Sequence, residues 1–318
     1  MDIQKIVEEK SWKPCAVPGK ISTYDIKPQY KEFLRSFVKF DRKFKIVVDY
    51  ANAMGLYEFA GIADLFEVIP LYDTLDGTFP NHEANPLKLD TLTAICAKVK
   101  EVGADFGAAF DGDADRCIAV DENGAVVNGD HIIYLLGTQL KRNGELVNNT
   151  VVTTVMSNLG LYHALDEEGI AYVQTKVGDR FVYENMQETG NCIGGEQSGH
   201  IILKKYATTG DGVLTAIKVM ETMIDRKLPL SKLVSPVQML PQVMKNLRVA
   251  DKRAVREDEA VKAAVAQVSE ELGNTGRILV RESGTEPVIR VMVEAPTIQV
   301  CETCVDRILQ VIRERGLA

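Results

Sequence analysis

The chain has 318 residues, of which 46% are hydrophobic and 26% are charged. This composition is typical of a globular protein, and the length allows two or three domains, each with its own core. The formal net charge of −8 argues against nucleic acid as the main partner, because phosphate backbones are bound by basic surfaces. A small phosphate ligand is compatible with this charge, because a few local arginines can hold one.

The sequence also lacks the signals of membrane insertion and secretion. No apolar run approaches the roughly 18–20 residues of a membrane span, and the charged start of the chain is unlike a secretory signal. The six cysteines are scattered. Cys301 and Cys304 have the spacing of half a zinc site, but no second pair follows. We therefore expect unpaired thiols, no membrane contact and a location in the reducing cytoplasm.

The first part of the chain predicts a linker followed by alternating strands and helices. Residues 1–40 are expected to be irregular at first, because prolines break any helix there, and then to form a leading helix over 26–38. Apolar patterning predicts strands at 44–49, 66–71 and 106–110 and a helix over 87–102. This alternation predicts parallel strands with both sheet faces covered, and ligands at the carboxyl ends of the strands.

A second cycle of elements begins near Asp130, and the last unit differs from both. The second cycle predicts strands at 151–155, 171–175 and 192–193 and helices at 159–168, 178–188 and 211–225. The last unit predicts a strand at 242–249, a helix at 255–272, strands at 277–281 and 288–294, and a final helix. We therefore predict an α/β fold of two mixed-sheet units, residues 41–129 and 130–238, followed by a small α+β unit, residues 239–318.

Three carboxylates stand directly after the predicted strand at 106–110. Asp111, Asp113 and Asp115 fall within five residues, and a hard divalent cation with oxygen ligands is the simplest way to relieve their repulsion. The small residues between them leave the backbone free to curl around an ion. Arg116 follows, and its planar guanidinium suits an anionic oxygen near the same metal.

Other interpretations of this run are weaker. A calcium hand would match at Asp111, Asp113, Asp115, Ile118 and Glu122, but its sixth position must be glycine and is Arg116 here. Its flanks also read as strands rather than helices. A phosphatase Asp-x-Asp pair normally continues into Thr or Val, not into a third aspartate. A solvated acidic turn does not account for the buried strand that precedes the carboxylates.

The hairpin between the last two predicted strands carries groups suited to a dianionic phosphate. Arg281 and Arg290 supply charge-assisted hydrogen bonds, Ser283 and Thr285 supply hydroxyls, and Gly284 lets backbone amides approach. A polar hairpin turn is the alternative, but two arginines around a Ser-Gly-Thr sequence exceed what a turn needs.

A third polar stretch follows the predicted strand at 192–193. Glu196, Ser198 and His200 alternate, so they would share one side of the chain if this loop is extended. An acceptor, a hydroxyl and an imidazole on one side suit a ligand with several hydroxyls, such as a sugar. Taken alone this signal is weak, since a lone histidine is more often structural.

Together these loops resemble the α-D-phosphohexomutase superfamily over essentially the whole chain. The matching stretches are the metal loop (residues 111–116), the sugar loop (195–200) and the phosphate loop (281–287). The resemblance implies phosphohexomutase domain II at 41–129, domain III at 130–238 and domain IV at 239–318. It further implies interconversion of a hexose 6-phosphate and 1-phosphate through a bisphosphate, by an intramolecular phosphotransferase.

The resemblance also implies a role for each loop residue. Mg²⁺ would bind Asp111, Asp113 and Asp115, and Arg116 would contact the phosphoryl group. Glu196, Ser198 and His200 would orient the sugar. The phosphate that does not react would be held by the remaining set, which is Arg281, Ser283, Gly284, Thr285 and Arg290.

The branch of the superfamily is less clear from the sequence. Residues 78–86 resemble the phosphomannomutase/phosphoglucomutase branch. Residues 154–158, 176–180 and 195–200 and the last domain resemble phosphoglucosamine mutase. We expect glucosamine 6-phosphate as the substrate. The alternatives are mannose or glucose phosphates, or a sugar-phosphate-binding fragment without catalysis.

One departure from the family concerns the nucleophile. The family carries a phosphorylated serine in a Ser-His-Asn-Pro-type loop of its first domain, and Ser11, Ser22 and Ser36 have none of those neighbours. The match begins at the second domain. We therefore expect this chain alone to be inactive and to bind magnesium weakly, with a first domain encoded upstream as one source of the serine.

Overall fold

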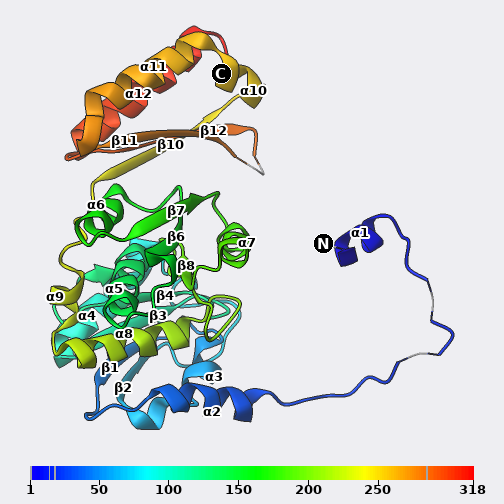
Figure 1. Ribbon diagram of the computed structural model, residues 1–318, viewed down its shortest axis with the longest axis vertical. Helices are drawn as coiled ribbons and strands as arrows, with labels where there is room; N and C mark the ends of the chain where they lie inside the picture. The colour runs from blue at the N-terminus through cyan, green and yellow to red at the C-terminus, as the bar shows by residue number, and fades with distance from the viewer. Residues whose placement is uncertain (1, 14, 18, 284–285) are drawn as a thin grey trace.

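Three units follow one another along the long axis of the molecule, and an N-terminal segment extends away from them (Figure 1). The computed structural model describes residues 2–13, 15–17, 19–283 and 286–318. The extended segment begins with a short helix, α1 (Asp2–Glu8), within the stretch that was expected to be irregular. Helix α2 (Lys27–Phe37) then joins the body, as the sequence predicts.

The first unit contains a five-stranded mixed sheet in the order β2-β1-β3-β4-β5. Strands β1 (Lys45–Asp49), β2 (Glu67–Leu71) and β3 (Phe106–Phe110) are parallel, whereas β4 (Cys117–Val120) and β5 (Val126–Val127) continue the sheet in antiparallel fashion. Helices α3 (Gly55–Phe59) and α4 (Thr93–Val102) connect the parallel strands. The metal loop is therefore the turn at which the sheet changes direction.

The second unit repeats this plan with a four-stranded mixed sheet in the order β7-β6-β8-β9. Its strands are β6 (Thr150–Thr154), β7 (Ala171–Thr175), β8 (Ile193–Gly195) and β9 (Ile201–Leu203). Its helices are α5 (Gly129–Arg142), α6 (Leu159–Glu167), α7 (Asp179–Thr189), α8 (Gly212–Arg226) and α9 (Leu230–Val234). The β8–β9 connection is the sugar loop.

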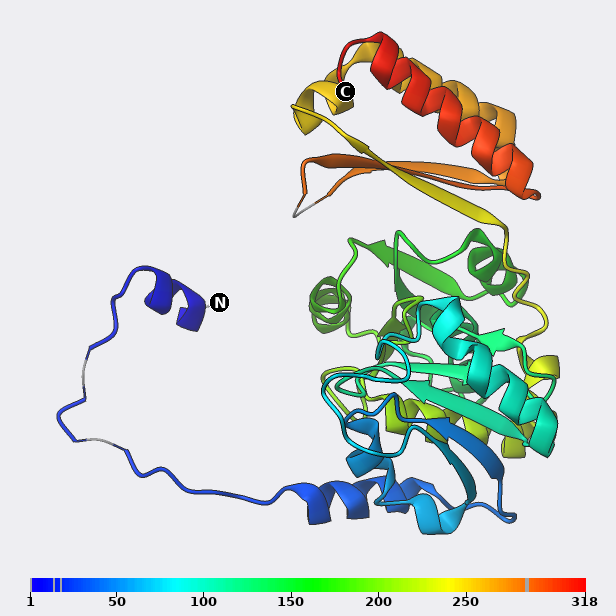
Figure 2. The same cartoon turned by 180° about the vertical axis from the view of Figure 1, so that it is seen from behind.

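The first two units share a large hydrophobic core, and each also has a smaller buried cluster of its own. A single cluster of buried side chains runs from Leu34 to Val237 and takes in residues of both sheets. Helix α8 packs against β3 and β4 of the first sheet and against α5, and α5 in turn contacts β8. Helix α8 belongs by sequence to the second unit but packs on the sheet of the first unit. The two sheets are therefore held as one layered body (Figure 2).

The third unit is a small α+β domain with its own core. Strands β10 (Gln242–Arg248), β11 (Arg277–Glu282) and β12 (Val288–Glu294) form an antiparallel sheet with β12 in the centre. The helices α10 (Lys252–Glu257), α11 (Glu259–Leu272) and α12 (Ile298–Glu314) lie on its outer face (Figure 1). The single helix predicted over 255–272 is interrupted, because Asp258 caps the start of α11.

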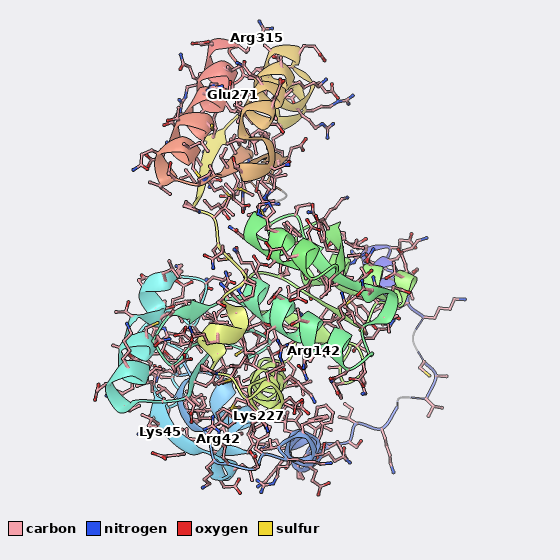
Figure 3. All side chains as sticks on the ribbon, turned by 60° about the vertical axis from the view of Figure 1, so that its left-hand side comes forward. Arg42, Lys45, Arg142, Lys227, Glu271 and Arg315 are labelled. Atoms are coloured by element: carbon pink, nitrogen blue, oxygen red, sulfur yellow. The ribbon has the colours of Figure 1, made fainter. Side chains whose placement is uncertain are left out.

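Charged side chains are abundant over the outer surface (Figure 3). At the end of the first sheet away from the metal loop, Arg42 pairs with Asp105 at 3.0 Å, and Lys45 donates from Nζ to the carbonyl oxygen of Val102. No helix in the described part of the chain is long and apolar enough to cross a membrane. The mixed α/β fold predicted from the sequence is confirmed.

A buried charged network joins the second and third units. Arg277 on β11 donates from Nε to Glu294 at 2.7 Å, and its Nη2 reaches the carbonyl oxygen of Ser157. Glu294 is fully buried and accepts the backbone N–H of Leu159 at the start of α6. The third unit is thereby anchored to the second through paired, hydrogen-bonded charges, as buried ions require.

Asp130, beside this junction, makes the stability of the protein depend on pH. Burial raises its pKa to about 7, although the Asn158 N–H that it accepts acts in the opposite direction. A carboxyl whose pKa is raised in the folded protein contributes its full stabilisation at a pH below its pKa in the unfolded chain. This contribution is lost as the pH rises through the folded pKa. Between pH 5 and pH 8 the loss is about 3 kcal/mol.

Asp130→Asn is therefore expected to flatten the pH profile of thermal stability while keeping the acceptor for Asn158. Melting curves of both proteins from pH 5 to pH 8 provide the test, with the variant gaining on the wild type as pH rises. Parallel profiles for the two proteins would contradict this assignment.

Candidate active site

The structure brings together the three aspartates of the metal loop. Each of Asp111, Asp113 and Asp115 offers a carboxylate oxygen, and these oxygens lie within 4.8 Å of one another. Arg116 closes the loop: its backbone N–H donates to Asp111 at 3.2 Å, and its guanidinium lies 3.5 Å from Asp111 and 3.7 Å from Asp115. Asp111 is almost fully buried, while Asp113 is exposed.

The metal loop rests on the start of helix α8, and this requires glycine. The Gly212 N–H donates to the carbonyl oxygen of Ala114 at 2.9 Å. A Cβ on Gly212 would lie 2.6 Å from the carbonyl oxygen of Arg116, so no larger residue fits at that contact. Asp211, just before it, caps α8 by accepting the Leu214 N–H and also accepts the Tyr30 hydroxyl from α2.

Negative charge accumulates around this loop. Burial, and then the neighbouring Asp115, raise the pKa of Asp111 to about 6. Burial also raises the pKa of Glu58 on α3 to about 7, with further contributions from Asp211 and Asp113. Glu58 stands 53 residues before the metal loop, and no motif in the sequence points to it. The ionised cluster is costly by itself, so a bound cation would stabilise it.

The donor set fits a hard divalent cation. All three candidate ligands are carboxylates, which magnesium and calcium prefer. Oδ1 of Asp115 is buried and has no hydrogen-bond partner among the described residues, so it is available to a ligand. A calcium hand is excluded, because strands β3 and β4 flank the loop where that motif needs helices.

The sugar loop is a tight turn, and not the extended segment in which Glu196, Ser198 and His200 would share one side. The Gly199 N–H donates to the Glu196 carbonyl oxygen, and the Glu196 N–H donates to the His200 carbonyl oxygen. Gly199 adopts a φ of +88°, and a Cβ there would lie 2.3 Å from the carbonyl oxygen of Cys117. The turn therefore sits directly against the end of the metal loop.

His200 lies beneath this turn rather than on its surface. It is only 3% exposed, and its Nδ1 lies 3.2 Å from a carboxylate oxygen of Asp115. The Gly210 N–H donates to Nε2 at 3.0 Å, so Nε2 carries the lone pair and Nδ1 carries the proton that faces Asp115. His200 thus links the metal loop, the sugar loop and the start of α8.

The other two sugar-loop residues are partly exposed. Glu196 accepts the Gly178 N–H at 2.9 Å through Oε1, which ties the sugar loop to the loop before α7. The Ser198 hydroxyl oxygen is buried and has no partner among the described residues. A ligand hydroxyl could therefore satisfy it.

The phosphate loop places two arginines side by side. Arg281 on β11 and Arg290 on β12 are directly opposite in the antiparallel register, and like charges so placed repel. Burial, and then the charge of Arg290, lower the pKa of Arg281. Arg290 donates to the Ser283 hydroxyl at 3.4 Å. Gly284 and Thr285 lie outside the described residues.

Lys252 is a further cation at this loop that sequence reasoning missed. Its Nζ donates to the carbonyl oxygen of Ser283 at 2.7 Å and to that of Glu286 at 3.4 Å. The lysine stands 29 residues before Arg281 on helix α10, so only the fold brings it to the loop. Two guanidinium groups and this ammonium gather at the hairpin and are suited to a dianion, although Arg290 also pairs with Glu286 at 3.2 Å.

A cavity of about 930 Å³ lies between the second and third units. Val155, Lys176 and Phe181 line it from the second unit, and Arg256 and Arg281 line it from the third. In the sequence, Lys176 was singled out only as part of residues 176–180, which resemble one branch of the family. Lys176 therefore adds positive charge from the second unit to a cavity that Arg256 and Arg281 line from the third.

Comparison with known proteins identifies this arrangement. Family models described as phosphoglucomutase/phosphomannomutase alpha/beta/alpha domain II, alpha/beta/alpha domain III and C-terminal domain match residues 28–124, 128–240 and 244–311. The chain belongs to the α-D-phosphohexomutase superfamily. The family resemblance read from the three loops is thereby confirmed.

Two curated relatives with similar sequences carry the same name. Phosphoglucosamine mutase of Lachnospira eligens is 55% identical over 243 residues, which are 76% of this chain and 53% of the relative. Phosphoglucosamine mutase of Bacillus subtilis is 54% identical over 225 residues, which are 70% of this chain and 50% of the relative. The chain thus spans about half the length of these relatives.

Solved phosphohexomutase structures share the fold. A phosphoglucomutase/phosphomannomutase family protein from Burkholderia thailandensis matches with a TM-score of 0.80 at 24% identity, over 99% of this chain and 70% of its own. Aspergillus fumigatus N-acetylphosphoglucosamine mutase, in complex with GlcNAc-6P and magnesium, matches with a TM-score of 0.71 at 18% identity, over 89% of this chain and 69% of its own.

Proposed function

We propose that this chain carries the metal, sugar and phosphate sites of a phosphoglucosamine mutase, which interconverts glucosamine 6-phosphate and glucosamine 1-phosphate through a bisphosphate. Curated relatives that are 54–55% identical bear that name, and this observation carries the proposal. The contact between metal loop and sugar loop, through His200 and Gly199, supports it. We propose Mg²⁺ as the cation and the boundaries 41–129, 130–238 and 239–318 for the three domains.

The residues of the metal loop would act on the reacting phosphoryl group. Asp111, Asp113 and Asp115 would hold the magnesium, which when bound draws negative charge from phosphoryl oxygens. Arg116 lies beside two of these aspartates, and its guanidinium would contact an oxygen of the same group. The Nδ1 proton of His200 faces Asp115 and fixes the orientation of its carboxylate. We therefore propose that His200 positions a metal ligand and does not contact the sugar directly.

The other two loops would bind the rest of the substrate. Glu196 and Ser198 would accept from and donate to sugar hydroxyls. Arg281, Ser283 and Arg290, together with Gly284 and Thr285, would hold the phosphate that does not react. An incoming dianion relieves the repulsion between the opposed arginines, so phosphate binding is favoured at that pair.

A second candidate function rests on residues 78–86, which resemble the phosphomannomutase/phosphoglucomutase branch. A catalytically incomplete sugar-phosphate-binding protein is the third. We propose to distinguish them by assaying the chain alone, and mixed with the serine-bearing domain of a curated phosphoglucosamine mutase, against glucosamine, mannose and glucose 6-phosphates.

The proposed function predicts that glucosamine 6-phosphate is converted fastest in the mixture. Mannose 6-phosphate clearly outrunning it would favour the second candidate. Binding of the 6-phosphates by calorimetry, without turnover in any mixture, would favour the binding protein.

A further inference from the structure

A buried aspartate–histidine pair lies at the carboxyl end of the first sheet, outside the three loops described above. His82 Nε2 lies 3.2 and 3.3 Å from the two carboxylate oxygens of Asp49. Asp49 is 1% exposed and ends strand β1, opposite Ala109 in the parallel register. Because Ala109 stands two residues before Asp111, the pair is beside the strand that delivers the metal loop.

The hydrogen bonds of His82 show that both ring nitrogens are occupied. Nδ1 lies 2.8 Å from the carbonyl oxygen of Glu83, which can only accept, so Nδ1 carries a proton. With both nitrogens engaged, His82 is not free to exchange a proton with a substrate, and its role is to hold structure.

What the pair holds is a loop of residues 72–85, here named the tether loop. Asn52 is its second anchor: its side-chain amide donates to the Thr74 carbonyl oxygen at 2.7 Å and accepts from Asn81 at 2.8 Å. The ring of His82 also packs edge-on against Tyr72, with centroids 5.0 Å apart. The tether loop is thereby anchored near its start, at Thr74, and near its end, at Asn81 and His82.

The same anchors reach the metal loop. The Met54 N–H, two residues after Asn52, donates to the carbonyl oxygen of Gly112 at 3.3 Å. On the other side, a Cβ on Gly112 would lie 3.8 Å from Cβ of Ala84 in the tether loop. The Gly112 backbone, between Asp111 and Asp113, is therefore enclosed by the β1–α3 connection and by the tether loop.

We infer that the Asp49–His82 pair is a positioning device that fixes the tether loop against Gly112 and so sets the geometry, and hence the metal affinity, of the three aspartates. This inference rests on the proposed metal site. Partners beyond the direct ligands typically change metal affinity by about 10–100-fold. His82 does not contact the three aspartates and acts on them only through the tether loop. We therefore expect about a 3- to 10-fold weakening of Mg²⁺ or Mn²⁺ binding in His82→Ala.

The experiment compares four variants with the wild-type chain by metal titration. His82→Gln keeps one amide donor toward Asp49 and is expected to recover part of the affinity. Asp49→Asn keeps the acceptor for the Ala51 N–H but loses the charge that pairs with His82, and it is expected to behave like His82→Ala. His163→Ala, at an exposed position on α6, is the matched control and should bind metal as the wild type does.

A second readout needs no metal. Hydrogen–deuterium exchange of the metal-free protein should rise in His82→Ala and Asp49→Asn, both in residues 72–85 and in residues 111–116, and stay unchanged in His163→Ala. Wild-type metal affinity in both His82→Ala and Asp49→Asn, or faster exchange confined to the tether loop, would overturn the inference. A wild-type chain that binds neither cation would instead overturn the proposed metal site.

Discussion

Asp111→Asn is expected to weaken magnesium binding by about 100-fold or more, because it removes a charged oxygen from a site with three carboxylates. The shape of the side chain is kept, and the Asn oxygen can still accept the Arg116 N–H. Titration calorimetry with Mg²⁺ at pH 8, where Asp111 is ionised, measures the change. Asp166→Asn, exposed on α6, serves as the control for lost negative charge.

The affinity for magnesium is also expected to depend on pH. The pKa of Asp111 is raised to about 6, so protons compete with the cation below that pH and the affinity should fall as pH decreases through it. Above that range the affinity should level off. Binding that is independent of pH between 5 and 8, or unchanged in Asp111→Asn, would show that the cation binds elsewhere.

Arg281→Ala is expected to lower the affinity for glucosamine 6-phosphate by about 10- to 100-fold, since one of two charge-assisted contacts to a phosphate is removed. The variant should be no less stable than the wild type, because the substitution relieves the repulsion with Arg290 across the strands. Calorimetry measures the affinity and thermal melting measures the stability.

Arg253→Ala is the matched control for this second prediction. Arg253 lies on α10 in the same unit, exposed and paired with Glu257, so its removal changes the net charge equally without touching the phosphate loop. Equal affinity in Arg281→Ala and wild type would show that the phosphate is held elsewhere. An equal loss in both variants would reduce the effect to net charge.

The features that could be predicted from the sequence depend on residues that are close together in the chain. Strong apolar or β-branched patterning marks the strands at 106–110, 171–175 and 288–294, and these are found with the predicted bounds. The metal loop could be recognised because its three carboxylates are contiguous. The order of strands and helices was sufficient for the α/β class.

The features that the sequence did not reveal depend on distant contacts. Helix α8 packs on the first sheet although it follows the second sheet in the chain, and no periodicity signals that choice. His200 points inward because Gly199 takes a positive φ and turns the loop, whereas alternation assumed an extended chain. Glu58, Lys252 and the Asp49–His82 pair are single residues brought to the loops only by the fold.

The central claim is that the metal loop and the phosphate loop serve one ligand, and phosphorus relaxation tests it most directly. In the complex of this chain with Mn²⁺ and glucosamine 1,6-bisphosphate, the paramagnetic ion shortens the ³¹P relaxation time of whichever phosphate lies near Asp111, Asp113 and Asp115. Because the bisphosphate of a mutase binds in either orientation, the account predicts relaxation of both phosphorus nuclei, each while it lies at the metal loop and Arg281 and Arg290 hold the other. At a ligand concentration that saturates only the wild type, both effects should be strongly reduced in Arg281→Ala. Relaxation of neither phosphorus, or relaxation unaffected by Arg281→Ala, would contradict it.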